Sequence, residues 1–531
     1  MTEVSRRGLL VGAAAVGSAA VAGSATPAAA SPASYRPEAE KVLPGTGRYE
    51  DLLLRGLERR FHGSPDYIRV PFTTEQVVDA VQDAVDQKKQ LAVRGGGHCY
   101  EDFVASDDVR VLIDMSHLTD VEYDPRLRAF SIGAGATLDK VFKDLYYGWG
   151  VTIPGGGCLT VGVGGHFAGG GYGPLSRLFG SVVDHLYGVE VVVVDKRGRA
   201  RAVLATRENQ HRDLWWAHTG GGGGNFGVVT RYLLRSHGVS GADPTRALPR
   251  PPETLMSAVV AFDWNALTKE SFTRTVSNFF AWYEKYSAPG NPYASLYSPF
   301  LLGAKATGGL LLSSQLDGTL PNAEKMLRDF HAAVLEGVEP KPYVEDPHPG
   351  PFLATTRQRS IAEDMSGGTR GKLKAAYFRK GWNARQIGVL FDALQKPEAN
   401  ANTVALLVPY GGQINAIAPT ATATAQRDSI MKLALGTSWT DAAEDEKHLT
   451  WSRDVYQELY RDTGGVPVSN EFNDGSYINY CDVDLMDPKL NTSGVPWTTL
   501  YYKQNYRRLR QLKAKWDPRD TFHHAMSIEL P

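Results

Sequence analysis

The 531-residue sequence has little cysteine, almost no net charge and, beyond its N-terminal segment, no long apolar run. Its three cysteines are an odd number, which excludes a disulfide framework that uses every thiol. A formal net charge of -1 gives no electrostatic reason to expect nucleic acid as a partner. Because no later segment is apolar over the length that a bilayer requires, we expect no membrane span. The length predicts at least two domains, and the hydrophobic content of 42% is typical of a soluble globular protein.

The N-terminal segment differs from the rest of the chain. Arg6 and Arg7 form a twin-arginine pattern, and residues 11–25 continue it as an alanine-rich apolar run. Residues 28–30 are small and offer a cleavage site. The pattern predicts an export signal at residues 1–30 and a secreted or exported protein, because the run is too short for a membrane span. The alternatives are an alanine-rich disordered tail with two arginines by chance, and a cytoplasmic protein that does not use the signal.

Glycine is abundant and gathers in three loops. The longest is residues 154–173 (PGGGCLTVGVGGHFAGGGYG); the others are residues 94–98 (RGGGH) and 220–227 (GGGGGNFG). A glycine cluster this dense costs backbone entropy and builds no core, so it indicates close approach of backbone to a ligand. Backbone N–H groups turned toward phosphates or a flat ring are the usual reason. The three loops therefore predict a large, phosphate-bearing cofactor that is contacted from several sides.

Strands, loops and helices alternate along the chain, which predicts an α+β or α/β protein. Hydrophobic patterns predict strands at residues 91–93, 111–115, 129–133, 188–195, 200–204, 228–234, 255–262 and 403–409. Helical periodicity and capping residues predict helices near residues 49–60, 74–85, 137–147, 273–283, 322–335, 441–460 and 501–516. A proline-, glycine- and arginine-rich stretch at 240–252 predicts a domain boundary.

His98 and Cys158 are each preceded by three glycines, so two side chains able to bond to an electrophilic cofactor are presented alike. The competing interpretation for His98 is a capped or core histidine. A zinc site is a poor explanation, because two ligands without clustered partners do not form a tetrahedral shell, and we expect no metal. Residues 222–227 match G-x-G-x-x-G, but this loop precedes a strand instead of following one, which argues against a Rossmann dinucleotide site.

Several of these motifs together resemble the berberine-bridge-enzyme-like oxidases, flavoproteins of the vanillyl-alcohol-oxidase/PCMH fold. The resemblance covers nearly the whole mature chain, and its order and spacing are similar to those of hexose oxidases that tailor glycopeptide antibiotics. The motifs that carry it are RGGGH at 94–98, PGGGC at 154–158, the glycine-rich run at 162–172, DLWWA at 213–217, the third glycine loop with the strand after it, NY at 479–480 and YYKQNYRRLRQLKAKWDP at 501–518.

The resemblance implies an α+β fold with a PCMH-type two-part FAD-binding domain and a substrate domain whose antiparallel sheet is covered by helices. The implied division is 31–240 for the FAD domain, 241–465 for the substrate domain and 466–531 for a C-terminal segment that returns to the FAD domain. It further implies FAD attached through His98 to the 8α-methyl and through Cys158 to C6 of the ring. The residues expected to bind the cofactor are His98, Cys158, Arg94, Gly95, Gly96, Gly97, Thr160, Gly162, Gly164, Gly165, Asn225, Gly227, Val228, Asn479 and Tyr480. Cys99, beside His98, departs from many relatives.

Three tyrosines are candidates for catalysis. Tyr480 follows Asn479 where relatives place a base near flavin N5, and a phenol that ionises near pH ~10 needs help from its neighbours to act so. Tyr172 leaves the long glycine stretch, and Tyr377 lies on a predicted strand from which it could approach on the other side. Strand alternation predicts that Tyr477 faces like Asn479 and not like Tyr480. The alternative for each is a buried tyrosine with a satisfied hydroxyl.

The sequence and the resemblance together predict an FAD-dependent oxidase that takes hydride from a sugar alcohol with Tyr480 as base and gives H2O2 from dioxygen. The expected substrate is the C6 primary alcohol of a glycosyl group on a glycopeptide antibiotic, oxidised to the carboxylic acid. One alternative is a hexose or oligosaccharide oxidase acting at C1 to give a lactone. The other is a non-catalytic flavin- or sugar-binding protein.

Overall fold

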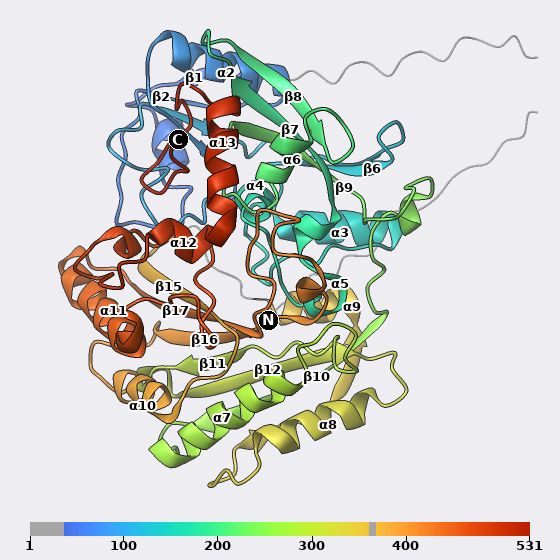
Figure 1. Cartoon of the computed structure of the whole chain (residues 1–531), viewed down its shortest axis with the longest axis vertical. Coiled ribbons are helices and arrows are strands. Elements are labelled where there is room, and N and C mark those ends of the chain that lie inside the picture. The colour runs from blue at the N-terminus through green and yellow to red at the C-terminus, as the bar shows by residue number, and fades with distance from the viewer. Residues whose placement is uncertain (1–36, 361–367) are drawn as a thin grey trace, which may run out of the picture. The chain divides into compact units, whose positions relative to one another are not determined.

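The structure, a computed structural model, describes residues 37–360 and 368–531. The predicted export signal at 1–30 lies outside the described residues. Within residues 38–531 the strands form three sheets, two in the N-terminal part of the chain and one in the middle (Figure 1). No described helix combines the length and the apolar surface that crossing a membrane would require.

The first sheet has the order β1-β2-β4-β3. Its strands are β1 (Lys41–Val42), β2 (Tyr67–Arg69), β3 (Leu91–Arg94) and β4 (Val111–Asp114). Strands β2 and β3 both run parallel to β4, as strands joined by a helical crossover do. Helix α2 (Thr74–Asp86) supplies one crossover, and it begins where the Thr73 side chain accepts a hydrogen bond from the Gln76 amide. The RGGGH loop leaves the end of β3.

The second sheet has the order β5-β6-β9-β7-β8. Its strands are β5 (Val121–Asp124), β6 (Ala129–Gly133), β7 (Leu186–Val194), β8 (Ala200–Thr206) and β9 (Val228–Leu234). The predicted hairpin of β7 and β8 is confirmed. Strand β7 is a run of valines because both of its faces are buried. Val191 and Val193 pack into the main core, whereas Val192 and Val194 pack beside α2.

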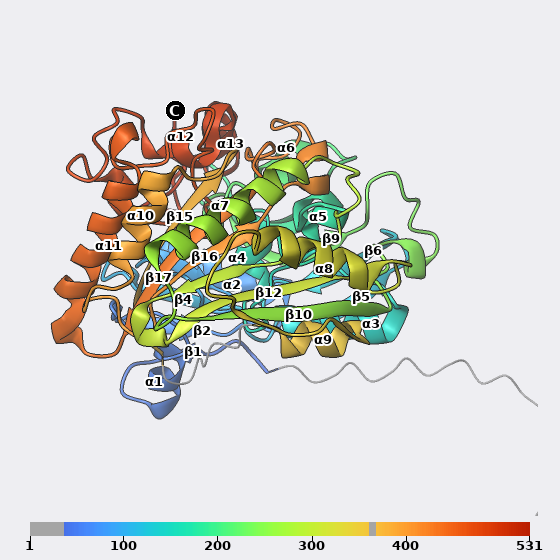
Figure 2. The ribbon, with the colours of Figure 1, turned by 90° about the horizontal axis from the view of Figure 1, so that it is seen from below.

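The third sheet is antiparallel, with the order β13-β10-β12-β11-β16-β17-β15 and β14 beside β10. Its strands are β10 (Thr254–Asp263), β11 (Phe300–Gly303), β12 (Gly309–Asp317), β13 (Tyr343–Val344), β14 (His348–Pro351), β15 (Arg370–Phe378), β16 (Val404–Pro409) and β17 (Met431–Trp439). Helices cover one face of it, as Figure 2 shows from below, and they are α7 (Lys269–Lys285), α8 (Ala323–Val334), α10 (Ala384–Ala393) and α11 (Asp445–Leu459). The expected α+β architecture, with an antiparallel sheet covered by helices, is confirmed.

Side chains alternate between the two faces of β16 and β17. Residues on one face pack into the core below the helices: Ala405, Leu407, Met431, Leu433 and Leu435. Residues on the other face line a cavity: Val404, Leu406, Val408, Lys432, Ala434, Gly436 and Ser438. The sheet therefore offers a side-chain surface on the face that no helix covers.

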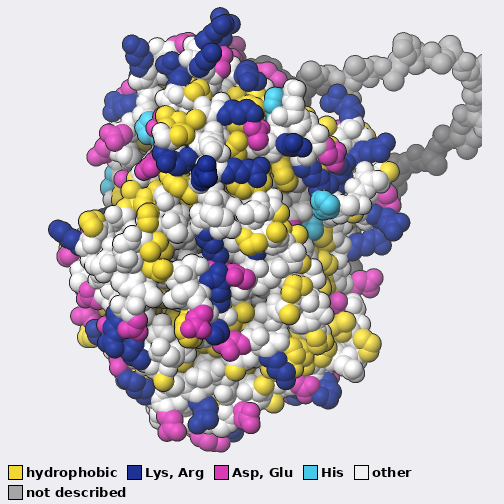
Figure 3. All heavy atoms as spheres, viewed as in Figure 1, with side chains coloured by type: hydrophobic (Ala, Val, Ile, Leu, Met, Phe, Trp, Pro, Cys, Tyr) yellow, Lys and Arg dark blue, Asp and Glu magenta, His cyan; other side chains and the backbone are white. Residues whose placement is uncertain are grey.

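The C-terminal segment returns to the N-terminal part through α12 (Trp497–Tyr502) and α13 (Tyr506–Trp516), and α13 packs beside α6 (Arg212–Ala217) (Figure 1). Leu509 and Leu512 of α13 are buried, as its spacing predicts. Its outer face is basic, and Lys and Arg side chains gather over it in Figure 3. The remaining α-helices of the described residues are α1 (Gly47–Leu53), α3 (Leu138–Trp149), α4 (Val163–Ala168), α5 (Ser176–Phe179) and α9 (Phe352–Gln358).

The main differences from the sequence-based prediction lie in the third sheet and the long glycine stretch. Strands β11, β12 and β17 were not predicted, and α4 forms inside the glycine-rich run at 163–168. Helix α4 forms although three of the residues at 162–165 are glycine, because Val163 and Phe167 bury one face in the core. The domain limits at 240 and 465 remain predictions.

Candidate active site

A cavity of about 810 Å³ lies between the three glycine loops and the uncovered face of the third sheet. Every residue that the resemblance assigns to cofactor binding lines this cavity except Thr160. Tyr172 and Tyr480 line it as well, whereas Tyr377 does not. Loops that are far apart in the sequence thus meet at one site, as the three glycine clusters predict.

His98 and Cys158 reach the same point of the cavity wall. The Thr160 Oγ1 atom lies 3.1 Å from His98 Nε2 and 3.5 Å from Cys158 Sγ. One hydroxyl therefore bridges the imidazole and the thiol, so a single ring system placed here can touch both. Thr160 itself stands behind them, which explains why it does not line the cavity.

The glycines of the first two loops are required because two backbones touch. A Cβ atom on Gly96 would lie 2.2 Å from the Gly162 nitrogen, and one on Gly162 would lie 2.2 Å from the Gly96 nitrogen. Neither position can take a side chain, since the obstacle is backbone on both sides. The loops that carry His98 and Cys158 are held together by this contact.

A second group of glycines faces open space instead. A Cβ atom on Gly165 would meet nothing within 4 Å, and one on Gly157 or Gly223 would meet its nearest atom only at 4.0 Å. All three line the cavity: Gly157 from the loop before α4, Gly165 from within α4 and Gly223 from the third loop. The space that their missing side chains leave is cavity, which fits a flat or phosphate-bearing group that approaches the backbone closely.

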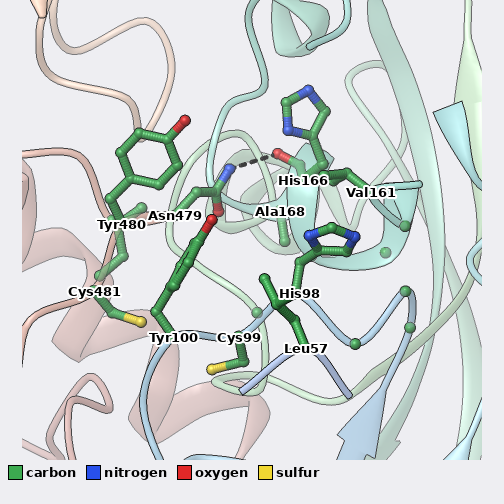
Figure 4. A pocket seen from close by; sticks show the side chains of 18 of the residues that line it. Leu57, His98, Cys99, Tyr100, Val161, His166, Ala168, Asn479, Tyr480 and Cys481 are labelled. Carbon is green, nitrogen blue, oxygen red and sulfur yellow. Dashed lines mark hydrogen bonds between the residues drawn. The ribbon is translucent and has the colours of Figure 1, made fainter. Parts of the chain in front are cut away.

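His166 ties the glycine stretch to the C-terminal segment. The Gly156 amide donates to its Nε2 at 3.0 Å, and its backbone carbonyl accepts from Asn479 Nδ2 at 2.9 Å (Figure 4). Burial, aided by Lys432 and His98, lowers the pKa of His166 to about 3. The ring is therefore neutral at ordinary pH and acts as a hydrogen-bond acceptor.

Tyr480 lies at the end of a turn, because its amide donates to the Tyr477 carbonyl at 2.8 Å. The prediction that Tyr477 and Tyr480 face different ways is therefore wrong, because a turn replaces the expected strand. Their rings lie 5.3 Å apart, and both face Lys432. Tyr477 does face like Asn479, as predicted, since Asn479 Nδ2 donates to its hydroxyl at 2.8 Å. Tyr477 Oη also accepts from the Gly171 amide at 3.2 Å, which anchors the glycine stretch.

Tyr172 is 7% exposed, and no hydrogen-bond partner of its hydroxyl is found among residues 37–360 and 368–531. Burial and the neighbouring phenols of Tyr480 and Tyr477 raise its pKa well above the usual range. A buried hydroxyl without a partner that borders a cavity is available to a ligand. Its position next to the predicted cofactor site agrees with its place at the end of the glycine stretch.

Tyr377 is placed differently from the expectation that it could approach the cofactor from the other side. It is fully buried on β15, and its ring packs 4.9 Å from Tyr410 and 6.0 Å from Tyr477, one layer behind the cavity wall. The correction has a simple cause, since Tyr477 stands between Tyr377 and the cavity. Tyr377 can support the site only through its neighbours.

Lys432 was missed by the sequence analysis, and it is the most unusual residue of the site. It lies on β17, is 2% exposed, and its Nζ is 3.8 Å from the ring centre of Tyr480 and 4.5 Å from that of Tyr172. Burial lowers its pKa well below the ordinary value, and no carboxylate pairs with it in the described part of the chain. The signal in the sequence is that Lys432, Ala434 and Gly436 alternate with Leu433 and Leu435 along β17. This alternation separates a leucine face, which packs in the core, from a face that carries the lysine.

Comparisons with known proteins agree with this geometry. Residues 65–201 match the FAD binding domain family, and residues 476–529 match the family described as berberine and berberine like. Over its whole length the chain is 49% identical to aclacinomycin-N/aclacinomycin-A oxidase of Streptomyces galilaeus, covering 99% of that protein. This chain belongs to the berberine-bridge-enzyme-like flavoenzymes of the PCMH superfamily.

Two further proteins are similar to this chain over most of their length. A crystal structure of a glycopeptide hexose oxidase complexed with teicoplanin is 50% identical, with a TM-score of 0.89, and the match covers 92% of this chain and 99% of that one. Hexose oxidase of Chondrus crispus is 31% identical over 89% of this chain and 92% of its own length.

As a berberine-bridge-enzyme-like flavoenzyme, the protein is an FAD-dependent oxidase, and the residues present fit that cofactor. Backbone from three glycine loops lies open to the cavity, and His98 and Cys158 converge beside Thr160 at one end. His524, which also lines the cavity, lies beside the third glycine loop at Gly223 and stacks on Phe103 with ring centres 4.0 Å apart. The cavity therefore offers open backbone for phosphates together with two side chains, His98 and Cys158, that can bond to the flavin ring.

Proposed function

We propose that this protein oxidises the C6 primary alcohol of a glycosyl group on a glycopeptide antibiotic to the carboxylic acid, with dioxygen as the acceptor and hydrogen peroxide as the product. The observation that carries the proposal is the 50% identity, over 99% of its length, to a glycopeptide hexose oxidase that was crystallised with teicoplanin. The 49% identity to aclacinomycin-N/aclacinomycin-A oxidase also supports a glycosylated small molecule as the substrate.

In this proposal, FAD is held through covalent bonds to His98 and Cys158, which converge on Thr160. When bound, the flavin accepts a hydride from the substrate carbon and passes the electrons to dioxygen. The glycine loops hold its phosphates through backbone N–H groups. The protein's own contributions are orientation of the alcohol and movement of its proton.

Tyr480 Oη takes the proton of the substrate hydroxyl in the proposed reaction. A positive charge close to a phenol favours its ionised form, and Lys432 Nζ lies 3.8 Å from the Tyr480 ring centre. Burying an ammonium without a counter-charge is costly, so a phenolate at Tyr480 also stabilises Lys432. The Tyr172 hydroxyl, which lies on the same cavity wall, is placed to hydrogen-bond the alcohol.

One alternative has its own supporting observation. The 31% identity to hexose oxidase of Chondrus crispus favours oxidation of a free or oligomeric sugar at C1, which would give a lactone. The two reactions need the same base and cofactor, so only the product separates them.

The deciding experiment is a product analysis with a panel of acceptors. The purified protein would be incubated with a glycopeptide antibiotic, its aglycone, a glycosylated polyketide and free hexoses, and the products identified by mass spectrometry and NMR. A glycopeptide that gains one oxygen and loses two hydrogens at C6 would support the proposal. A lactone from free hexose would support the alternative. A yellow protein that consumes no oxygen with any of these compounds would support a flavin- or sugar-binding protein without catalysis.

The role of Tyr480 is tested by Tyr480→Phe, which removes only a hydroxyl. General-base assistance contributes about 10²–10⁴ in rate, so we expect anaerobic reduction of the flavin by substrate to slow at least about a hundredfold. Flavin attachment should persist, and substrate affinity should change little. The matched control is Tyr147→Phe, because Tyr147 is 72% exposed on α3. A near-normal rate of reduction in Tyr480→Phe would transfer the base role to Tyr172.

We also propose export through the twin-arginine route, with residues 1–30 as the signal. The motivation is the Arg6–Arg7 pair before an alanine-rich run. Changing both arginines to lysine should leave the precursor inside the cell, and unchanged secretion of that variant would contradict the proposal.

A further inference from the structure

The fold brings together the two cysteines that the flavin does not need. Cys158 stands with His98 at the cofactor end of the cavity, whereas Cys99 and Cys481 come from opposite ends of the chain. Both of them line the same cavity, and Figure 4 shows their side chains directed toward each other below Tyr480. Cys99 directly follows His98, and Cys481 directly follows Tyr480.

The two thiols face each other in the wall of the cavity. The neighbouring Cys99 thiol, together with burial, raises the pKa of Cys481 well above its usual range. Cys481 is 5% exposed, whereas Cys99 is half-buried and its Sγ also donates to the Glu101 carbonyl at 3.3 Å. Cys99 is thus the thiol that a small molecule in the cavity reaches first, with Cys481 behind it.

One buried ammonium group holds the two cysteine segments in register. Lys372 Nζ on β15 lies 2.7 Å from the Glu101 carboxylate and 2.7 Å from that of Asp482. Glu101 lies two residues after Cys99, and Asp482 follows Cys481 directly. All three charged side chains are almost completely buried, so the segments cannot separate without exposing or unpairing a charge. The placement of the two cysteine segments side by side is therefore a fixed feature of the fold.

We propose that Cys99 and Cys481 are a redox-active pair that closes to a disulfide when hydrogen peroxide enters the cavity. The Cys99 sulfur attacks one peroxide oxygen, giving a sulfenic acid at Cys99 and one water. The Cys481 sulfur then attacks the Cys99 sulfur, forming the S–S bond and releasing a second water. Two thiols are oxidised by two electrons, and one peroxide is reduced to two waters. The inference rests on the proposed function only for an internal source of peroxide, because added peroxide tests it separately.

Closing this bond would join the loop that carries His98 to the segment that carries Tyr480. It would fix the proposed base relative to the cofactor loop through a covalent link in place of the contacts among Glu101, Lys372 and Asp482. The proposed pair also accounts for the odd number of cysteines: Cys158 binds the cofactor, and Cys99 and Cys481 bond to each other.

The test is peptide mapping of the full-length protein after treatment with hydrogen peroxide. Free thiols would be blocked with N-ethylmaleimide during denaturation, and the protein digested with trypsin and examined by mass spectrometry without reduction. We expect residues 95–110 and 462–489, which contain Cys99 and Cys481, to be joined by a bond that dithiothreitol breaks. The Cys481→Ala and Cys99→Ala variants are the controls, and each should lack this linked species.

The same map separates this bond from the proposed flavin attachment. A doubly attached flavin would join residues 95–110 to 144–177, which contain Cys158, and that link should survive dithiothreitol. Failure of the flavin link would therefore leave the disulfide result readable, and the reverse also holds. The inference is overturned if Cys99 and Cys481 both carry N-ethylmaleimide after peroxide treatment, if Cys99 stops at the sulfinic acid, or if 462–489 is linked to 144–177.

Discussion

Gly96 and Lys432 stand on two walls of the same cavity, and the walls are built by different means. On the first wall, backbone meets backbone, and Gly96 and Gly162 leave no room for a side chain. On the second wall, a sheet presents alternate side chains, among them Lys432 next to the phenols of Tyr172 and Tyr480. The first wall suits a cofactor recognised through its phosphates and flat ring, and the second suits a reaction that needs a charge at one atom.

The difference predicts how each wall tolerates change. A backbone contact is all-or-none, because a Cβ atom has nowhere to go, whereas a side chain can be replaced while its strand remains in place. Substitutions on the glycine wall should therefore affect folding and cofactor content, and substitutions on the sheet wall should affect rate. Four sets of variants test this contrast, beginning with the largest expected effect.

The Gly96→Ala change should abolish soluble, yellow protein, since its Cβ would lie 2.2 Å from the Gly162 nitrogen. The Gly165→Ala change places a Cβ in the cavity, where it meets no protein atom within 4 Å, so we expect a folded protein with little flavin. The control is Gly148→Ala on exposed α3, which should stabilise the helix by up to about 1 kcal/mol. Soluble yield, flavin absorbance and thermal unfolding would report the three outcomes. A Gly165→Ala protein with full flavin would contradict the cofactor assignment of this wall.

The His98→Ala and Cys158→Ala changes test the cofactor end of the cavity. Each single variant should keep the flavin through the remaining bond after acid denaturation, whereas the double variant should release all of it. Fluorescence of the denatured polypeptide on a gel would measure this. Complete release from the unmodified protein would rule out covalent attachment.

The Lys432→Met variant should fold and keep its flavin. Substrate should reduce that flavin about tenfold to a hundredfold more slowly than in the unmodified protein. Because burial lowers the pKa of Lys432, its ammonium and the phenolate of Tyr480 stabilise each other as a pair, and Lys432→Met leaves the phenolate without this partner. The rising limb of the rate against pH should therefore move upward by about one unit or more. Lys396→Met is the matched control, because Lys396 is exposed and remote from the cavity lining. A slower enzyme with an unmoved pH profile would show that Lys432 acts by packing alone.

The Tyr377→Phe change should have the smallest effect. Its ring packs behind Tyr477, and Phe preserves that packing, so we expect reduction of the flavin to stay within about threefold of the unmodified rate. Anaerobic stopped-flow reduction is again the measurement. A loss similar to that of Tyr480→Phe would mean that the phenols act as one network, and the distinction between wall and backing layer would fail.

The first wall could be predicted from the sequence because glycine is informative about backbone by itself. The loops at 94–98, 154–173 and 220–227 were located, and the structure brings them to one cavity. Helices such as α2 and α13, and strands such as β7, were also predicted, since their periodicity and caps are local signals.

The second wall could not be predicted because its chemistry depends on which strands become neighbours. Lys432 acquires its meaning only when β17 lies between β15 and β16, and when a turn at 477–480 folds over it. The same reason explains the error at Tyr377: its strand was predicted, but the layer in front of it comes from residues about a hundred positions later. The turn at Tyr480 was mistaken for a strand because a tyrosine-rich segment favours both.

Asn225 joins the third glycine loop of the first wall to the C-terminal segment. Its Oδ1 accepts from the Ile528 amide at 2.8 Å, and its carbonyl accepts from the buried Lys513 Nζ at 2.9 Å, so the third glycine loop is fastened by residues that follow it by about 300 positions. A ribosome adds roughly 5–20 residues each second from the N-terminus, so Asn225 is made well before its two partners. Lys513 and Ile528 are synthesised about 300 positions after Asn225, so the third glycine loop gains these two hydrogen bonds late in synthesis. A chain cut before Lys513 lacks both contacts, and this loop then has no fastening from the C-terminal segment.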